Sequence, residues 1–234
     1  MRKKINKIDL KLSFIRSAVN RDLGDIKELI DLSEGMLRRQ CTQLTKQLDR
    51  ECQKATEEEK EFLGGWYAGD FIQLTEVFPK IQRYSLFTTV MASAEFDLYR
   101  ICIEMQQILK KEKEYKKPRK SIIKNCFRYL EEECHVSLSK FRIYTDEIEM
   151  YQRLRNCIVH SEGKNTDQNP TEIEKYCKEK PTLSIDRHGY IILKENFLNI
   201  AMHIITQFFQ RLIESCKTEV YRDSYRLTHP PLAG

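Results

Sequence analysis

Glycine and proline are scarce in this chain: its 234 residues include only 8 glycines and 6 prolines. These two residues are the strongest breakers of regular structure, so their scarcity favours long, uninterrupted elements. Hydrophobic residues make up 41% of the sequence, which is enough to build a core. The sequence therefore predicts an all-α fold, arranged as one domain with an extension or as two small domains.

Long apolar runs are also missing. No stretch approaches the roughly 18 consecutive apolar residues that a membrane helix needs. The basic start, Met1 to Lys4, is not followed by the apolar run of a secretion signal. We therefore expect a cytoplasmic protein with no membrane among its partners.

The eight cysteines include no C-x-x-C pair. Cysteines at that spacing are typical of zinc ribbons and thioredoxin-like redox sites, so both are disfavoured. We expect most of the cysteines to be small apolar side chains of a reduced protein. Cys157-x-x-His160 resembles half of a zinc site, but no second pair has the spacing to complete it. No metal site and no cofactor are expected.

The N-terminal quarter shows a long helical pattern. From residue 22 to about residue 63, apolar residues form one narrow stripe, and Gly64-Gly65 is expected to end this helix. Residues 5–20 fit a helix and a strand equally well. The apolar face is too thin to form a core by itself, so this segment should pack on the rest of the chain or on a partner.

Four further helices are predicted downstream. The strongest has apolar residues at alternating steps of three and four, as in a helical bundle or coiled coil, and the last is apolar on nearly every side. Their predicted ranges are residues 80–111, 119–133, 145–160 and 196–216.

Two irregular features separate the last two helices. The polar segment 164–181 is predicted to be a mobile loop, and residues 182–185 and 190–193 have the pattern of a β-hairpin. The predicted organisation is a helical arm, a helical bundle and a flexible tail, over residues 1–65, 66–222 and 223–234.

One predicted helix end carries a motif of residue types that are common in catalytic sites. The chain reads Arg155-Asn156-Cys157-Ile158-Val159-His160 there. Asn156 and His160 are four residues apart and share a helix face, whereas Arg155 and His160 lie about 140° apart around the helix. A long arginine side chain can still reach a phosphate that the histidine contacts. A guanidinium that holds phosphate oxygens and an imidazole that moves a proton are the minimum equipment for RNA cleavage without a metal.

Arg155 needs a partner in the folded chain. It lies about 60° from Ile158, the centre of the inner helix face, among apolar neighbours. An unpaired buried charge is strongly destabilising. Glu95, on the shoulder of the apolar seam of helix 80–111, is the candidate partner, although a solvated position for Glu95 is equally compatible with the pattern. The candidate catalytic residues are Arg155, Asn156, His160 and Glu95.

Basic residues cluster between residues 110 and 128. Nine lysines and arginines stand there against two glutamates, with Tyr115 and Phe127 interleaved, and the net charge of the whole chain is +5. Such a cluster can follow a phosphate backbone, or it can be a solvated helix face. The candidate RNA-binding residues are Lys116, Lys117, Arg119, Lys120, Lys124 and Arg153.

Together these features resemble the HEPN superfamily. The resemblance rests on bundle helices, an R-x4-H motif with asparagine after the arginine in "LRNCIVHSEG", a loop and a final apolar helix, and it covers roughly residues 70–220. It implies a HEPN-like helical bundle and a metal-independent endoribonuclease that works as a homodimer, often as a toxin or antiviral defence effector. Glu162 stands where one branch of the family has a tyrosine that is modified, so control through that tyrosine is not expected.

The function expected from the sequence is RNA cleavage by attack of the ribose 2′-hydroxyl at a site built by two subunits. An antitoxin or another defence-system subunit is a possible partner for residues 1–65. Two alternatives stay open at this point. One is a non-catalytic interaction module in which Arg155 and His160 are structural, and the other is a regulatory module that binds a nucleotide in the same groove.

Overall fold

The computed structural model describes residues 7–111, 115–116, 118–165 and 170–228, and almost all of them are helical. The helices are α1 (Lys7–Cys52), α2 (Glu57–Ile72), α3 (Phe78–Ile108), α4 (Ile122–Glu132), α5 (Arg142–Ser161), α6 (Pro170–Glu179) and α7 (Phe197–Thr228). A short β-hairpin of β1 (Leu183–Ile185) and β2 (Ile191–Leu193) precedes α7. The predicted all-α fold with a small hairpin before the last helix is confirmed.

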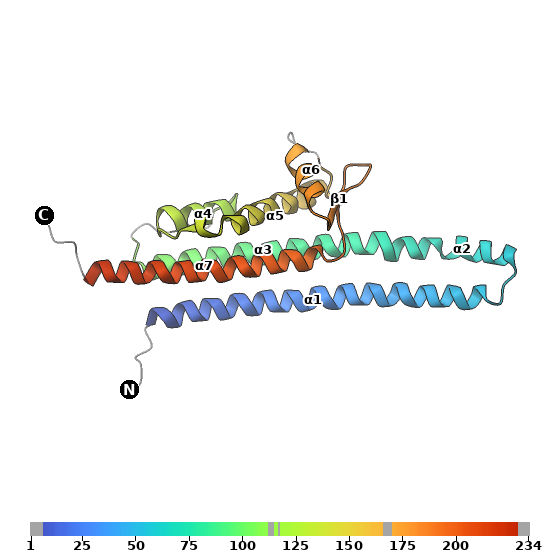
Figure 1. Ribbon diagram of the computed structural model, residues 1–234, viewed down its shortest axis with the longest axis horizontal. Helices are drawn as coiled ribbons and strands as arrows, with labels where there is room; N and C mark the ends of the chain where they lie inside the picture. The colour runs from blue at the N-terminus through green and yellow to red at the C-terminus, as the bar shows by residue number, and fades with distance from the viewer. Residues whose placement is uncertain (1–6, 112–114, 117, 166–169, 229–234) are drawn as a thin grey trace, which may run out of the picture.

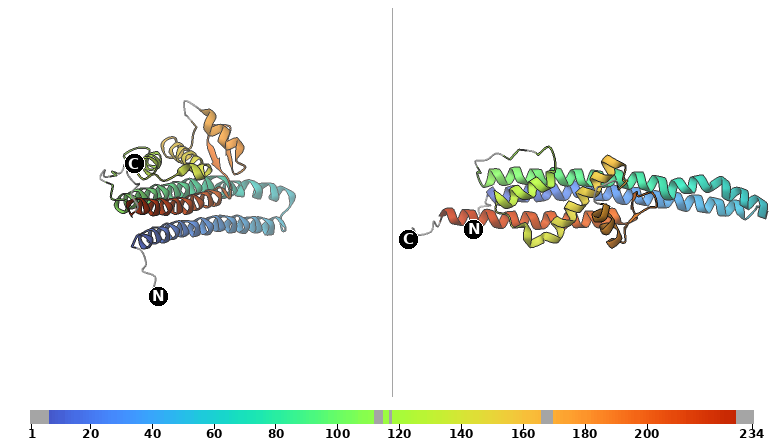
Figure 2. Two further views of the ribbon diagram at one scale, coloured as in Figure 1. Left: turned by 60° about the vertical axis from the view of Figure 1, so that its left-hand side comes forward. Right: turned by 90° about the horizontal axis from the view of Figure 1, so that it is seen from above.

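The helices form layers around α3 and α7. These two lie side by side, α1 runs along one side of the pair, and α4 and α5 cover the other side (Figure 1). In the view from above, α5 crosses the pair diagonally (Figure 2). The outer part of α1 and the whole of α2 project beyond the bundle at one end, whereas the start of α1 and the end of α7 lie at the opposite end.

The first helix begins earlier and ends earlier than the sequence suggested. Residues 7–20, which fitted two patterns, belong to α1, and α1 stops at Cys52 rather than near residue 63. The prediction that Gly64-Gly65 ends a helix is wrong, because both glycines lie inside α2. The break lies instead before Thr56, whose hydroxyl accepts the Glu59 backbone N–H while Glu59 accepts the Thr56 N–H. This reciprocal capping box starts α2.

The helical path continues from α2 into α3 through one π-helical turn, η1 (Gln73–Val77). The first half of α1 shares the core of the bundle, because its inner residues are almost fully buried against α3 and α7. They are Leu12, Ile15, Val19, Leu23 and Ile30. Leu37 is still buried and Glu34 pairs with Arg83 of α3, so only the end of α1 stands apart from the bundle. The described part of the segment 1–65 therefore has one part within the core and one part outside it.

Two other sequence predictions need correction. The segment 164–181 contains α6, which the polar composition concealed, and α6 buries Ile173, Tyr176 and Cys177 on one face. The last helix extends to Thr228, so the predicted flexible tail begins with helical residues; residues 229–234 lie outside the described chain. The predictions for α3, α4, α5 and the hairpin agree with the structure to within a few residues.

Asp97 is a charged group in the core. Its side chain is 1% exposed, and its Oδ1 lies 2.7 Å from Nη2 of Arg100. The other terminal nitrogen of Arg100, Nη1, lies 3.8 Å from Oδ2 of Asp22. Desolvation raises the pKa of Asp97 to about 6, and the nearby Arg100 opposes this shift only in part. The folded state therefore holds the Asp97 proton more tightly than the unfolded chain does.

A pH-dependent stability difference follows. Because the folded pKa is raised, the stability contributed by protonated Asp97 is complete below about pH 4 and is lost as the pH rises through 6. Asparagine does not titrate, so the Asp97→Asn variant should not show this loss. The difference in free energy of unfolding, variant minus wild type, should therefore increase by as much as about 3 kcal/mol from pH 4 to pH 7.5. Urea unfolding at both pH values measures the difference, and a constant difference would contradict the assignment.

Candidate active site

The R-x4-H motif lies in the last turns of α5, and the chain leaves that helix in a defined way. Glu162 and Gly163 adopt left-handed backbone conformations, with φ of 52° and 82°, and the Gly163 N–H donates to the Cys157 carbonyl over 3.1 Å. This satisfies a carbonyl of the last helical turn. Gly163 is thus the stop that the sequence predicted.

Gly163 also fits closely against Tyr84 of α3. A Cβ atom at position 163 would lie only 2.1 Å from the Tyr84 hydroxyl oxygen, so only glycine allows this approach. The Tyr84 hydroxyl donates to the Ile191 carbonyl, and the Ile191 N–H donates to the Gly163 carbonyl over 2.9 Å. Burial raises the pKa of Tyr84 well above its usual range, so it remains a hydrogen-bond donor. The end of α5 is thereby fixed to α3 and to the hairpin.

Arg155 and Glu95 form the ion pair that the helical pattern suggested. Arg155 Nη2 lies 2.5 Å from Glu95 Oε1, and the side chains are 19% and 10% exposed. Arg155 Nη1 donates to the Asn156 side-chain carbonyl over 3.1 Å. The pair joins α5 to α3 and holds the guanidinium near the surface. Each Nη nitrogen keeps a second N–H that these two bonds do not use.

Gln152 is a further member of this cluster that the sequence analysis did not single out. Its amide nitrogen donates to the same Glu95 oxygen over 3.4 Å. Gln152 lies one turn before Arg155 on the helix, and polar residues at this spacing share a face. That spacing was the available signal. Glu95 thus accepts from two side chains of α5, which restricts its carboxylate to one orientation.

His160 and Asn156 lie on the exposed side of α5, as their shared face required. His160 is in the last helical turn, next to the Glu162–Gly163 exit. The structure therefore places an exposed imidazole and a held guanidinium in the same end of one helix. The other exposed helical histidine among the described residues, His203, lies on α7, which packs against the inner side of α5.

Arg153 is already paired. It forms an ion pair with Glu172 in the first turn of α6. Both side chains are about half exposed, so the pair contributes little to stability. Glu172 belongs to the segment predicted to be a loop, which is why the sequence gave no sign of this contact. An RNA phosphate would have to compete with Glu172 for Arg153.

The basic cluster lies at the start of α4, on the same side of the α3–α7 pair as α5 (Figure 1). The candidates within the described residues are all exposed, and they are Lys116, Arg119, Lys120 and Lys124. Lys117 lies outside the described residues. Tyr115 and Phe127 are buried, and Tyr115 packs against Tyr99 and Tyr129. The expectation that these two aromatic rings are interleaved in a nucleic-acid surface is wrong, since neither ring is accessible to a base.

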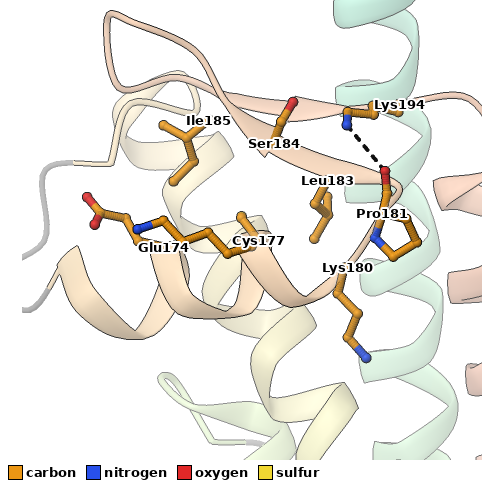
Figure 3. Close-up of a pocket in the computed structure, with 9 residues that line it drawn as sticks. Glu174, Cys177, Lys180, Pro181, Leu183, Ser184, Ile185 and Lys194 are labelled. Carbon is orange, nitrogen blue, oxygen red and sulfur yellow. Dashed lines mark hydrogen bonds between the residues drawn. The ribbon is translucent and has the colours of Figure 1, made fainter.

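A separate cleft of about 400 Å³ lies between α6 and the hairpin. Figure 3 shows Cys177 of α6 and Leu183 of β1 in its interior, with lysines at its edge. Two of these lysines have internal partners: Lys180 pairs with Glu147, and Lys194 donates to the Pro181 carbonyl over 3.2 Å. No residue of the R-x4-H motif lines this cleft, so it is distinct from the candidate active site.

Within the described residues, no helix combines the length and the apolar character needed to cross a membrane. No group of three or more histidine, cysteine, aspartate or glutamate side chains is arranged there as a metal site. The candidate site consists of Arg155, Asn156, His160, Glu95 and Gln152.

Comparison with family models, curated proteins and solved structures finds no match to this chain. The resemblance to the HEPN superfamily therefore rests on the sequence motif and its context alone.

Proposed function

We propose that the protein is a metal-independent endoribonuclease of the HEPN type. The observation that carries the proposal is the Arg155 guanidinium, fixed by Glu95 at 2.5 Å and by Asn156 at 3.1 Å, in the same helix end as the exposed His160. A held guanidinium is a preorganised site for charge that develops on a phosphoryl group. The imidazole is suited to proton transfer near neutral pH.

The nucleophile in this proposal is the ribose 2′-hydroxyl next to the scissile phosphate. Covalent geometry already holds it near the phosphorus, which supplies effective concentration at little entropic cost. His160 takes the 2′-hydroxyl proton while the 2′-oxygen bonds to phosphorus and the bond to the 5′-oxygen breaks. A second, protonated His160 gives its proton to the leaving 5′-oxygen. Arg155 neutralises charge on the non-bridging oxygens.

The base and the acid must come from two copies of the chain, because each motif supplies one histidine. The active species is therefore proposed to be a homodimer with the two ends of α5 facing each other. The exposed basic residues at the start of α4 would bind flanking phosphates and make binding dependent on salt. A toxin or an antiviral defence effector is the biological role that the resemblance suggests.

A non-catalytic interaction module is the second candidate. The observation that favours it is the Arg155–Glu95 pair itself, which gives Arg155 a structural partner without any substrate. In that case the protein would bind a partner through the part of α1 and α2 that projects beyond the bundle and would leave RNA intact. The two candidates differ in whether purified protein cleaves RNA.

The chemistry predicts which substrates and products will be seen. RNA should be cut in the presence of EDTA, giving a 2′,3′-cyclic phosphate or its 3′-phosphate on one side and a 5′-hydroxyl on the other. The same sequence as DNA, or RNA with 2′-O-methyl groups throughout, should resist cleavage because the nucleophile is missing. End-group analysis of labelled oligonucleotides tests this. Cleavage of the methylated RNA, or 5′-phosphate ends that appear only with added magnesium, would refute the mechanism.

A further inference from the structure

The arm, which we define as residues 38–77, consists of the outer part of α1, the turn, α2 and η1. It projects beyond the bundle as a two-helix hairpin (Figures 1 and 2). All of its residues are described, and only Tyr67 among them is buried. Most helical stability in proteins comes from packing of an apolar face, so an arm with so small an interior is poorly stabilised by itself.

The apolar seam between the two helices of the arm is only half closed. Its residues recur at steps of three and four, as in a coiled coil, yet they are half-buried rather than buried. They include Leu44 and Leu48 on α1 and Leu63 and Phe71 on α2. Two helices alone leave one side of such a seam open to water. A second pair of helices would close it.

A second, exposed face of α2 has the spacing of a helix-packing surface. Phe62, Gly65, Trp66 and Gly69 stand at positions i, i+3, i+4 and i+7, which share one face. Phe62 and Trp66 are 69% and 72% exposed, and their rings stack at 6.2 Å. A Cβ atom at either glycine would meet nothing within 4 Å. Within one copy, therefore, no packing reason requires glycine there, although each glycine weakens the helix.

The two helices of the arm carry opposite charge. From residue 57 to residue 77, six carboxylates stand against the single lysine Lys60, and they are Glu57, Glu58, Glu59, Glu61, Asp70 and Glu76. The α1 part, residues 38–52, has four basic residues against two acidic ones, and the basic ones are Arg38, Arg39, Lys46 and Arg50. Pairing α2 with another α2 would bring like charges together, whereas pairing α2 with another α1 brings opposite charges together.

We propose that the arms of two copies of this chain pair into a four-helix bundle, with α1 of each arm against the Phe62–Trp66 face of the other copy's α2. The pairing satisfies three observations at once: the half-open seam is closed, the exposed aromatic face is covered, and acidic α2 meets basic α1. Neighbouring helices then run antiparallel, as in up-down-up-down bundles. Because the contact is the same on both copies, it closes as a symmetric dimer.

Pairing of the arms has a consequence for the candidate active site. If the two arms are parallel, the main helical bundles of the two copies lie at the same end of the four-helix bundle. The dimer then contains two copies of His160 at that end. This consequence depends on the proposed ribonuclease function. The pairing itself rests only on the arm, so each can fail without the other.

Association of the full-length protein tests the proposal. Trp66 is the only tryptophan in the chain, so its emission reports directly on this face. The wild type should sediment as a dimer at micromolar concentration, and on dilution to monomer the Trp66 emission should shift to longer wavelength. Phe62→Asp should weaken dimerisation by about 30-fold or more, as expected for an aromatic anchor of an interface. Phe14→Asp is the matched control, since Phe14 is 66% exposed on α1 outside the arm.

A variant at Gly69 tests whether weaker dimerisation results from unfolding of the arm rather than from a blocked interface. Leucine forms helices better than glycine, and position 69 has open space in one copy, so Gly69→Leu should keep or increase the helical circular dichroism. It should still weaken dimerisation, because the added side chain occupies the face that the partner covers. Monomeric wild type at micromolar concentration, or unchanged dimerisation in both arm variants, would overturn the proposal.

Discussion

Replacing His160 with alanine is expected to reduce RNA cleavage by about 100-fold to 10,000-fold, the usual contribution of a general acid or base. In a composite site the variant removes both the base and the acid, so the upper end of this range is expected. The fold should be unaffected, because His160 is exposed in the last turn of α5. Cleavage of a labelled oligonucleotide by purified variant and wild type, followed over time, measures the loss.

His203→Ala is the matched control for this experiment. His203 is also an exposed helical histidine, but it lies on α7. Its replacement should leave both the cleavage rate and the melting temperature unchanged. If His160→Ala cuts RNA as fast as the wild type, the catalytic assignment fails. If the wild type and both variants cleave RNA at the same low rate, the observed activity belongs to a contaminating nuclease.

Arg155→Ala is expected to lower cleavage by about 100-fold or more and to destabilise the protein as well. The catalytic effect arises because the guanidinium no longer stabilises charge on the phosphoryl oxygens. The stability effect arises because Glu95, only 10% exposed, is left without its cation. Removing one partner of a buried pair costs about 3 kcal/mol. Single-turnover cleavage and urea unfolding of the same preparation measure the two effects.

Glu95→Gln separates the two roles of Arg155. Glutamine keeps the shape of the side chain but removes its charge, so Arg155 remains present and is held less firmly. We expect a smaller loss of cleavage than in Arg155→Ala, together with a loss of stability. A loss of stability in both variants from a protein that never cleaves RNA would instead support the interaction module.

Arg153→Ala provides the comparison at a nearby surface position. The Arg153–Glu172 pair is about half exposed on both sides, and such pairs contribute about 0–1 kcal/mol. The variant should therefore unfold at nearly the wild-type urea concentration. A loss of stability as large as that of Arg155→Ala would show that the difference in solvent exposure does not determine how much each ion pair contributes to stability.

Helix boundaries show where local sequence signals sufficed and where they were overridden. Gly163 was recognisable as a stop because glycine readily adopts the left-handed conformation that ends a helix. The same reasoning failed at Gly64-Gly65. Glycine inside a helix costs only about 1 kcal/mol relative to alanine, and the Thr56 capping box together with Tyr67, whose hydroxyl donates to Glu51 of α1, favours a helix through this position. The Thr56–Glu59 spacing of the capping box was the available sequence signal for a helix start here, and the helix predicted over residues 22–63 ran through it.

The polar composition of residues 164–181 led to an incorrect prediction of a loop where the structure has α6. Its surface residues resemble those of a loop, and its buried face consists of Ile173, Tyr176 and Cys177 at helical spacing. A face this short is ambiguous until something packs against it. The hydroxyl of Tyr176 and the ammonium of Lys180 both contact Glu147 of α5, which secures the helix to the bundle. These contacts depend on the tertiary fold.

By itself, the sequence determined the helical class, the register of α5 and the residues that share each of its faces, because helical periodicity is a local property. It also determined that Arg155 needed an acidic partner, because a charge near an apolar face must be paired. Tertiary structure alone decided that Glu95 is that partner and also accepts from Gln152, that Tyr84 and the hairpin fix the end of α5, and that Glu172 pairs with Arg153. These contacts join segments 57, 107 and 19 residues apart in the chain, and only the packing of whole helices sets which segments meet.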